Sequence, residues 1–151
     1  MRDYIKDIRK MVGHLPIFMC TSGVVLIDDK NRLLLQLRTD NNKWGIIGGA
    51  MELGETTEET AKREVKEECG LDVHRLEFFN VYSGETMHYI YPNGDEVYTV
   101  AVIYLSKNYS GNLKMQESEI KALKFFEIDE IPDEIHPTDV QILKDIKNKL
   151  N

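Results

Sequence analysis

The sequence predicts an α/β fold in which helices pack on a mixed β-sheet, and three observations lead to this prediction. Runs rich in β-branched and aromatic residues recur along the chain, separated by turn signals, as expected for strands. Apolar residues at helical spacing lie near both ends, and a charged helix is expected between them. No internal repeat or low-complexity stretch interrupts the pattern, so residues 1–151 are expected to form a single domain.

The first third of the chain is expected to hold one helix and a β-hairpin. Residues 5–12 carry apolar side chains at helical spacing and are followed by a glycine that can end a helix. Residues 16–27 and 33–37 are typical of strands, and the polar turn between them predicts that they pair as a hairpin. Residues 39–56 contain four glycines and are expected to be mostly loop.

The next helix is expected to begin near Thr57, because clear signals lie at both of its ends. Thr56 and Glu59 have the spacing of a capping box, in which each residue hydrogen-bonds the backbone N–H of the other. Gly70 can adopt the left-handed conformation that commonly ends a helix. The segment between them is therefore predicted to be helical.

The second half of the chain is expected to supply the remaining strands and a last helix. Residues 71–82, 89–91, 97–105 and 124–128 are typical of strands, and an Asn-Gly turn predicts that the second and third form a hairpin. Pro137 suits the first turn of the last helix. The apolar face of that helix is expected to carry Val140, Leu143, Ile146 and Leu150.

Composition and charge exclude several classes of function. The chain has 19 basic and 26 acidic residues and a net charge of −7, so it lacks the basic excess of proteins that bind nucleic acid or anionic membranes. We expect neither a membrane partner nor sequence-specific nucleic-acid binding. The N-terminus is charged where a signal peptide would be apolar, and two cysteines make no disulfide framework. A cytoplasmic location is expected.

The most informative segment runs from Gly49 to Leu71 and holds seven glutamates against three basic residues. On a helix, Glu64, Glu67 and Glu68 gather on one side, next to the stripe of apolar residues, so they are expected at the rim of the buried face. Like charges at this spacing destabilise a helix unless a cation lies among them. Oxygen ligands without nearby Cys or His suit Mg²⁺ or Mn²⁺, and Mg²⁺ often bridges to substrate phosphates.

The same helix has a plainer interpretation, which its spacing alone does not exclude. An acidic stripe is usually a solvated face, and the preceding glycines would then be ordinary turn residues. Arg63 lies one turn from both Glu59 and Glu67, so it can pair with them in either case. Helix geometry therefore leaves metal binding and simple solvation open.

The complete segment resembles a known motif. Its spaced positions are occupied by Gly49, Glu55, Arg63, Glu64, Val65, Glu67, Glu68, Gly70 and Leu71. This arrangement resembles the Nudix box, G-x5-E-x7-R-E-U-x-E-E-x-G-U with U an aliphatic residue, at every fixed position. The resemblance implies the Nudix α/β/α sandwich with a mixed β-sheet. It also implies hydrolysis of a nucleoside diphosphate linked to another group.

The resemblance further implies the roles of individual residues. By position, the metal ligands would be Glu64, Glu67, Glu68 and the Gly48 carbonyl. Glu67 or Glu64 would accept a proton from the attacking water, while Arg63 and Glu55 would hold the segment in shape. Gly49 and Gly70 would be structural. The implied cofactor is Mg²⁺, with Mn²⁺ as an alternative, and a homodimer is a family possibility.

Weaker candidates for substrate binding lie outside the box. Arg38 ends a predicted strand and could bind a phosphate, although a surface arginine is an equal alternative. Glu117 and Glu119 lie in a polar loop, where solvated acids are common. Tyr91, like Tyr89 and Tyr98, could stack on a nucleobase or pack within the sheet.

Two functions from different classes remain open. The first is Mg²⁺-dependent hydrolysis of a diphosphate linkage in a small nucleotide: a nucleoside triphosphate, ADP-ribose, a nucleotide sugar or a dinucleoside polyphosphate. The second is a nucleotide-sensing module that binds without catalysis. Such modules usually lose part of the glutamate set, which is complete here. Phosphate release from a nucleotide panel with and without Mg²⁺ distinguishes the two.

Overall fold

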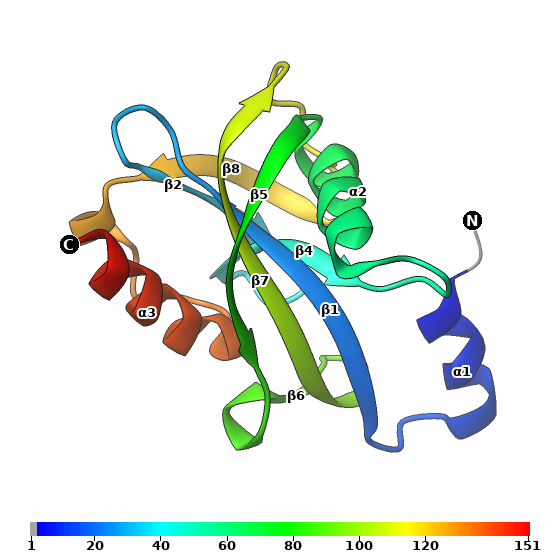
Figure 1. Ribbon diagram of the computed structural model, residues 1–151. Coiled ribbons are helices and arrows are strands. Elements are labelled where there is room, and N and C mark those ends of the chain that lie inside the picture. Colours follow the sequence, from blue (N-terminus) through cyan, green and yellow to red (C-terminus); the bar gives the residue numbers. More distant parts are fainter. Residues whose placement is uncertain (1–2) are drawn as a thin grey trace.

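The computed structural model describes residues 3–151 and contains two β-sheets between helices (Figure 1). The larger sheet has the strand order β4-β1-β7-β5, with β6 also paired to β7; β1 and β7 are parallel and the other pairs antiparallel. Its strands are β1 (Ile17–Leu26), β4 (Ile47–Ala50), β5 (Asp72–Tyr82), β6 (His88–Ile90) and β7 (Glu96–Ser110). The smaller, antiparallel sheet consists of β2 (Leu33–Arg38), β3 (Trp44–Gly45) and β8 (Ile120–Phe126).

The helices lie on different sides of these sheets, and together they form the α/β sandwich that the sequence predicts. They are α1 (Tyr4–Val12), α2 (Thr57–Cys69) and α3 (Val140–Leu150), with short 3₁₀ turns at Glu85–Met87, Ile128–Glu130 and Pro137–Asp139. Figure 1 shows α2 and α3 on opposite sides of β1 and β7, and α1 at the margin. Within residues 3–151, no helix has the length and apolar character needed to cross a bilayer.

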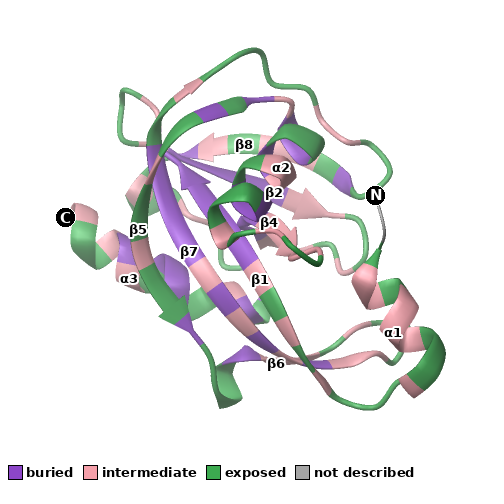
Figure 2. Ribbon diagram, turned by 45° about the vertical axis from the view of Figure 1, so that its right-hand side comes forward, coloured by how far each residue is buried: buried purple, intermediate pink, exposed green. Residues whose placement is uncertain are grey.

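Alternate residues of β1 serve two separate cores, as expected for a strand buried on both faces. Val24 and Leu26 belong to the cluster that includes Ala61, Val65 and Cys69 of α2. Val25, which lies between them on the strand, belongs to the other cluster, which contains Ile142, Leu143 and Ile146 of α3. Figure 2 shows the buried residues concentrated along the central strands and on the inner sides of these helices. The two clusters fix α2 relative to the sheet, and therefore fix the residues of the acidic segment.

The expected hairpin of residues 16–27 and 33–37 is wrong. The two segments are strands, but they diverge into different sheets and share only a single bridge, between Ile27 and Leu33. Both edges of β1 are occupied by other strands, β4 on one side and β7 on the other. A local turn signal cannot reveal these distant partners.

Other boundaries differ in smaller ways. The loop expected over 39–56 contains the short strands β3 and β4, and the last strand runs over 120–126 rather than 124–128. Pro137 begins a 3₁₀ turn that precedes α3. Val140 is 39% exposed, and Ile142 is buried beside Leu143 and Ile146 in the core. Glycine content and single-strand patterns are weak guides where pairing across the sheet decides the structure.

The helix that follows the glycine-rich segment forms as predicted. The Thr56 side chain accepts from the Glu59 backbone N–H at 3.1 Å, and the Glu59 carboxylate accepts from the Thr56 N–H at 3.4 Å. Gly70 adopts the left-handed conformation, with φ of 75°. Local signals at both ends, confirmed here, determine where α2 begins and ends.

Candidate functional site: an acidic cleft with an aromatic end

The packing of α2 places its three candidate glutamates at different depths. Val65 lies at the centre of the buried stripe and is fully buried. Glu68 is only 6% exposed, so it lies inside the protein and not at its rim. The side chains of Glu64 and Glu67 are 14% and 49% exposed. The carboxylates therefore form a series from the interior to the solvent.

Two glycines of β4 allow the sheet to approach these carboxylates closely. The Gly48 backbone N–H donates to Glu68 Oε2 at 3.0 Å. A Cβ atom at Gly49 would lie 2.5 Å from Glu64 Cδ, closer than real Cβ contacts, and one at Gly48 would overlap the backbone of Ser22 and Gly23 in β1. Position 48 therefore requires glycine because it lies against backbone, whereas a side chain at position 49 would displace the Glu64 carboxylate.

Arg63 connects the glutamates of this segment. Its guanidinium contacts both oxygens of Glu55, with Nε to Oε2 at 2.7 Å and Nη2 to Oε1 at 3.0 Å. Nη1 donates to Glu64 Oε1 at 2.9 Å and to Glu67 Oε2 at 3.2 Å, and Nη2 also donates to the Ala50 carbonyl. The expected pairing with Glu59 is not formed, because that carboxylate caps α2. Arg63 thus joins the loop before α2 to the helix itself.

The glutamates of the segment have opposite pKa shifts. Hydrogen bonding to Arg63 lowers the pKa of Glu55 to about 2. Burial raises the pKa of Glu64 to about 7, although Arg63 opposes this shift. Burial, and then the nearby Glu64, raise the pKa of Glu68 well above its usual value. Glu55 is stabilised as a carboxylate, whereas Arg63 compensates the charge of Glu64 only in part and no cation pairs with Glu68 among the described residues.

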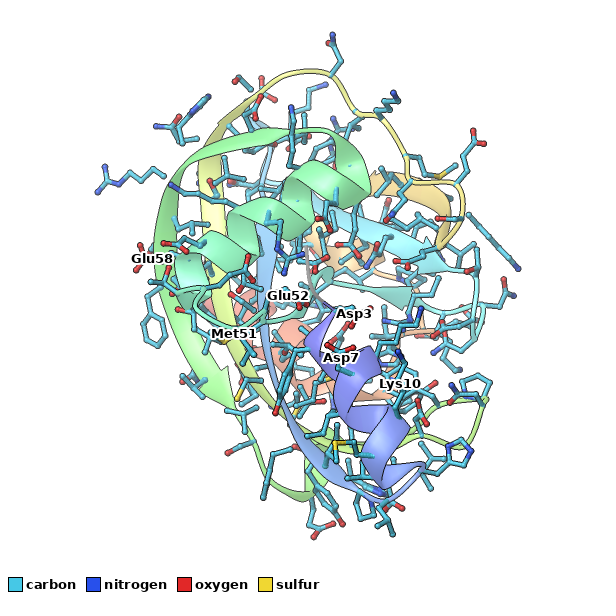
Figure 3. The ribbon with its side chains drawn as sticks, turned by 90° about the vertical axis from the view of Figure 1, so that its right-hand side faces the viewer. Asp3, Asp7, Lys10, Met51, Glu52 and Glu58 are labelled. Atoms are coloured by element: carbon cyan, nitrogen blue, oxygen red, sulfur yellow. The ribbon has the colours of Figure 1, made fainter. Side chains whose placement is uncertain are left out.

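The three glutamates of α2 named above, Glu64, Glu67 and Glu68, line one end of a cleft of about 1070 Å³. This acidic end, as we call it, is lined by Gly48, Gly49, Glu52, Arg63, Glu64, Glu67, Glu68 and Glu119. Helix α1 borders the cleft as well, and the Tyr4 N–H donates to Glu52 Oε1 at 2.8 Å. Figure 3 shows Asp3, which caps α1, together with Asp7 and Lys10 of that helix beside the loop that carries Met51 and Glu52. The volume is at the upper end of the range for small-molecule sites.

The other end of the cleft is aromatic. We define this aromatic end by the lining residues Arg38, Asp40, Tyr89, Tyr91, His136 and Asp139. The Tyr89 ring meets the Tyr91 ring edge-on, with centroids 5.0 Å apart, and the His136 ring at 4.5 Å. Arg38 donates to both carboxylate oxygens of Asp40, at 2.9 and 2.7 Å. One cleft thus combines a carboxylate cluster with ring faces that a planar group could contact.

Comparison with known proteins agrees with this geometry. The family model described as NUDIX domain matches residues 19–146, most of the chain. The chain belongs to the Nudix family. A crystal structure of the MutT NUDIX hydrolase from Burkholderia pseudomallei is similar, with a TM-score of 0.74 and 25% identity over 86% of this chain and 98% of that one. The predicted Nudix fold and family are both confirmed.

Two curated relatives of this Nudix chain are longer than the part of them that it matches. The chain is 31% identical over 121 residues to the NAD-capped RNA hydrolase NudC of Vibrio atlanticus, covering 80% of this chain and 41% of that protein. It is 36% identical over 110 residues to a MutT-like protein of Streptomyces ambofaciens, covering 73% of this chain and 64% of that protein. The chain therefore spans less than two thirds of the length of these relatives.

The acidic end brings together five residues of the Nudix box: Gly49, Arg63, Glu64, Glu67 and Glu68. Most of the weaker candidates also line the cleft. Arg38 and Tyr91 line its aromatic end. Glu117 is exposed and lies outside the cleft lining, where Glu119 takes part instead. Tyr98 also lies outside it and contacts the rings of Phe18 and His88.

The sequence analysis does not identify several residues that line the cleft. Gln36 lies within a run of leucines in β2, and a polar residue at a buried strand position could have drawn attention to it. His136 and Asp139 reach the cleft because their segment is attached to β3. The His136 N–H donates to the Trp44 carbonyl at 2.7 Å, and Asp139 Oδ2 accepts from the Ile46 N–H at 2.9 Å. No local pattern marks these two residues.

The acidic end fits a hard divalent cation by its chemistry. Within residues 3–151, no three acidic, His or Cys side chains already form a ligand cluster, since Arg63 and the Gly48 N–H engage several of the oxygens. The donors present are nevertheless oxygens, and burial disfavours the charge of both Glu64 and Glu68. Gln36 Oε1 is buried in the same lining without a hydrogen-bond partner among the described residues. A cation would favour the ionised carboxylates.

Proposed function

We propose that this Nudix chain hydrolyses a diphosphate linkage in a small nucleotide, using Mg²⁺ or, alternatively, Mn²⁺. The observation that carries the proposal is a carboxylate pair, the buried Glu68 and the half-buried Glu64, against the two glycines of β4 in a cleft with an aromatic end. The volume of the cleft suits a nucleotide, and the two ends suit its two chemically different parts.

The proposed ligands are Glu64, Glu67, Glu68 and the Gly48 carbonyl. A divalent cation bound there would supply neutralisation of the phosphate charge and would acidify the attacking water. Arg63 holds Glu64 and Glu67 in position through its two short contacts. Glu67, which is half exposed, or Glu64 then accepts the proton of that water.

At the aromatic end, Arg38 and Tyr91 are proposed to contact the substrate. Arg38 lines the cleft with its guanidinium already paired to Asp40, which holds it in one orientation. Glu117 and Glu119 are proposed as further contacts from the loop before β8. Glu119 lines the cleft and Glu117 does not, which supports a closer approach of Glu119 to the substrate.

A substrate panel with and without Mg²⁺ tests this function. The panel contains nucleoside triphosphates, ADP-ribose, a nucleotide sugar and a dinucleoside polyphosphate. It also contains NAD, because one relative is named an NAD-capped RNA hydrolase. We expect cation-dependent release of a nucleoside monophosphate or of pyrophosphate from at least one compound. Tight binding of a nucleotide without turnover would contradict hydrolysis and would favour the sensing module.

A further inference from the structure

Asn41 supports the aromatic end of the cleft from behind. Its Nδ2 lies 3.0 Å from the Tyr89 hydroxyl and 2.8 Å from His136 Nδ1. Its Oδ1 accepts from the Lys43 backbone N–H at 3.1 Å. Because a backbone N–H can only donate, this last bond fixes which side of the Asn41 amide is oxygen. The amide NH₂ therefore faces Tyr89 and His136.

This orientation determines where His136 carries its proton. An amide NH₂ has no acceptor, so His136 Nδ1 must be the unprotonated nitrogen that accepts from it. Burial, and then Arg38, lower the pKa of His136 to about 4, so the ring is neutral at pH 7. A neutral ring with a bare Nδ1 carries its hydrogen on Nε2.

Residues 3–151 supply no partner for the hydrogen on His136 Nε2 or for the hydrogen of the Tyr89 hydroxyl. No group among residues 3–151 forms a hydrogen bond with His136 Nε2, and the ring lines the cleft. The Tyr89 hydroxyl accepts from Asn41, which leaves its own hydrogen available for donation. Tyr89 and His136 both line the cleft, and their rings meet edge-on with centroids 4.5 Å apart, so the two donors belong to adjacent side chains of its aromatic end.

The backbone holds this donor pair in place before any ligand arrives. The Trp44 N–H donates to the Glu134 carbonyl at 2.8 Å, and the His136 N–H donates back to the Trp44 carbonyl at 2.7 Å. A Cβ at Gly45 would lie 2.9 Å from Asp139 Oδ2, so the glycine lets this segment lie directly on β3. A donor that is already positioned loses little entropy on binding.

We propose that His136 Nε2–H and the Tyr89 hydroxyl select a nucleobase edge that carries adjacent hydrogen-bond acceptors. This inference rests on the proposed function, which places the diphosphate at the acidic end. Hypoxanthine and guanine present the acceptors O6 and N7 together, whereas adenine presents an amino group beside N7. An amino group could donate to the Tyr89 hydroxyl, but it cannot accept from His136 Nε2–H, which would be left unpaired. The cleft therefore favours 6-oxopurines over adenine.

Free nucleosides test this selection without any hydrolysis. Inosine and adenosine differ at position 6 of the base, and neither needs a metal ion or a phosphate contact. We expect NMR titrations in metal-free buffer to show that inosine binds about 3- to 10-fold more tightly, with shifts at Tyr89 and His136; this range corresponds to one net hydrogen bond. Equal affinity, or tighter adenosine binding, would overturn the inference. The result does not depend on whether the chain hydrolyses nucleotides.

Three variants locate the cause of the preference. His136→Phe keeps a ring and removes the donor, so it should abolish the difference between the nucleosides. His88→Phe is the matched control, because His88 lies outside the cleft lining and pairs with Glu96. Asn41→Asp replaces the NH₂ with an acceptor and forces a proton onto His136 Nδ1. If His136→Phe does not fold, this variant still provides the test.

Imidazole ¹⁵N shifts report the tautomer directly. The native protein should show a protonated Nε2 and a bare Nδ1 at pH 7, and Asn41→Asp should show a protonated Nδ1 together with an altered inosine preference. A native Nδ1–H tautomer would overturn the inference. A preference that persists in His136→Phe would overturn it as well.

Discussion

The two ends of the cleft are built in different ways. The glutamates and glycines of the acidic end lie almost entirely within one continuous segment, Gly48–Glu68, and Arg63 connects them. The aromatic end is assembled from Arg38–Asn41, Tyr89–Tyr91 and His136–Asp139, three segments distant in the sequence. Chemistry that all members of a family share can be encoded locally, whereas selectivity arises where separate segments meet.

The ends also differ in their electrostatics. At the acidic end, the half-buried Glu64 and the buried Glu68 are carboxyl groups whose charge is incompletely compensated. At the aromatic end, Arg38 is paired with Asp40 and His136 is neutral at pH 7. The first end is therefore suited to a cation and a diphosphate, and the second to an uncharged, planar group. Separate substitutions at the two ends should have separable effects.

The largest expected effect is that of Glu68→Gln on turnover. The amide can keep the hydrogen bond from the Gly48 N–H but cannot supply a charged ligand, so kcat/KM should fall by about 10³-fold or more. Glu58→Gln is the matched control, since Glu58 is an exposed residue of α2 and should leave the rate unchanged. Steady-state kinetics on the best substrate, with circular dichroism to verify folding, provide the measurement. Full activity in Glu68→Gln would exclude a ligand role.

Gly49→Ala should weaken cation binding by about 10²-fold. Its Cβ would lie 2.5 Å from Glu64 Cδ and would displace that carboxylate, and ligand sites lose affinity steeply when a ligand is misplaced. Titration with Mn²⁺, followed by electron paramagnetic resonance, measures the affinity. Inosine binding at the aromatic end should be unaffected. Parallel loss of both would show that the variant has lost its fold and not only its cation site.

Two glutamates of the same segment, Glu55 and Glu64, should contribute to the free energy of unfolding with opposite dependences on pH. The pKa of Glu55 is about 2 in the folded protein, so its contribution is present above its ordinary pKa of 4.5 and is lost as the pH falls toward 2. The pKa of Glu64 is about 7, so the folded protein binds the extra proton and loses stability as the pH rises from 4.5 to 7.

Urea unfolding of the metal-free protein tests these signs. Glu55→Gln should cost about 2 kcal/mol at pH 7, the scale of hydrogen bonds to a charged group, and much less near pH 2. Glu64→Gln should become more stable relative to the native chain as the pH rises toward 8. The same direction of change in both variants would contradict the assignment.

The smallest expected effect comes from Asp40→Asn at the aromatic end. Asp40 occupies two donors of Arg38 and places a negative charge in the cleft lining. The amide would release one donor and remove that charge, so KM for a nucleotide should fall about 3-fold with kcat unchanged. An increase in KM would indicate that Arg38 must be held by Asp40 to bind substrate.

Features of the fold that depend on local contacts can be predicted from the sequence, whereas features that depend on contacts between distant segments cannot. Helix α2 formed where its capping box and Gly70 predicted, because both signals act within a few residues. The hairpin prediction failed because β4 and β7, remote in the sequence, pair with β1. Glu68 was expected at the rim of the buried face, yet the packing of α2 against β4 makes it nearly inaccessible.

Hydrolysis in ¹⁸O-labelled water tests the central claim most directly. A nucleotide that the chain cleaves is incubated with Mg²⁺, and the products are analysed by mass spectrometry. We predict one ¹⁸O atom in one of the two phosphate-containing products, only when the cation is present, and formation of that product by Glu68→Gln slower by about 10³-fold or more. Equal cleavage without the cation, or by Glu68→Gln, would contradict the account.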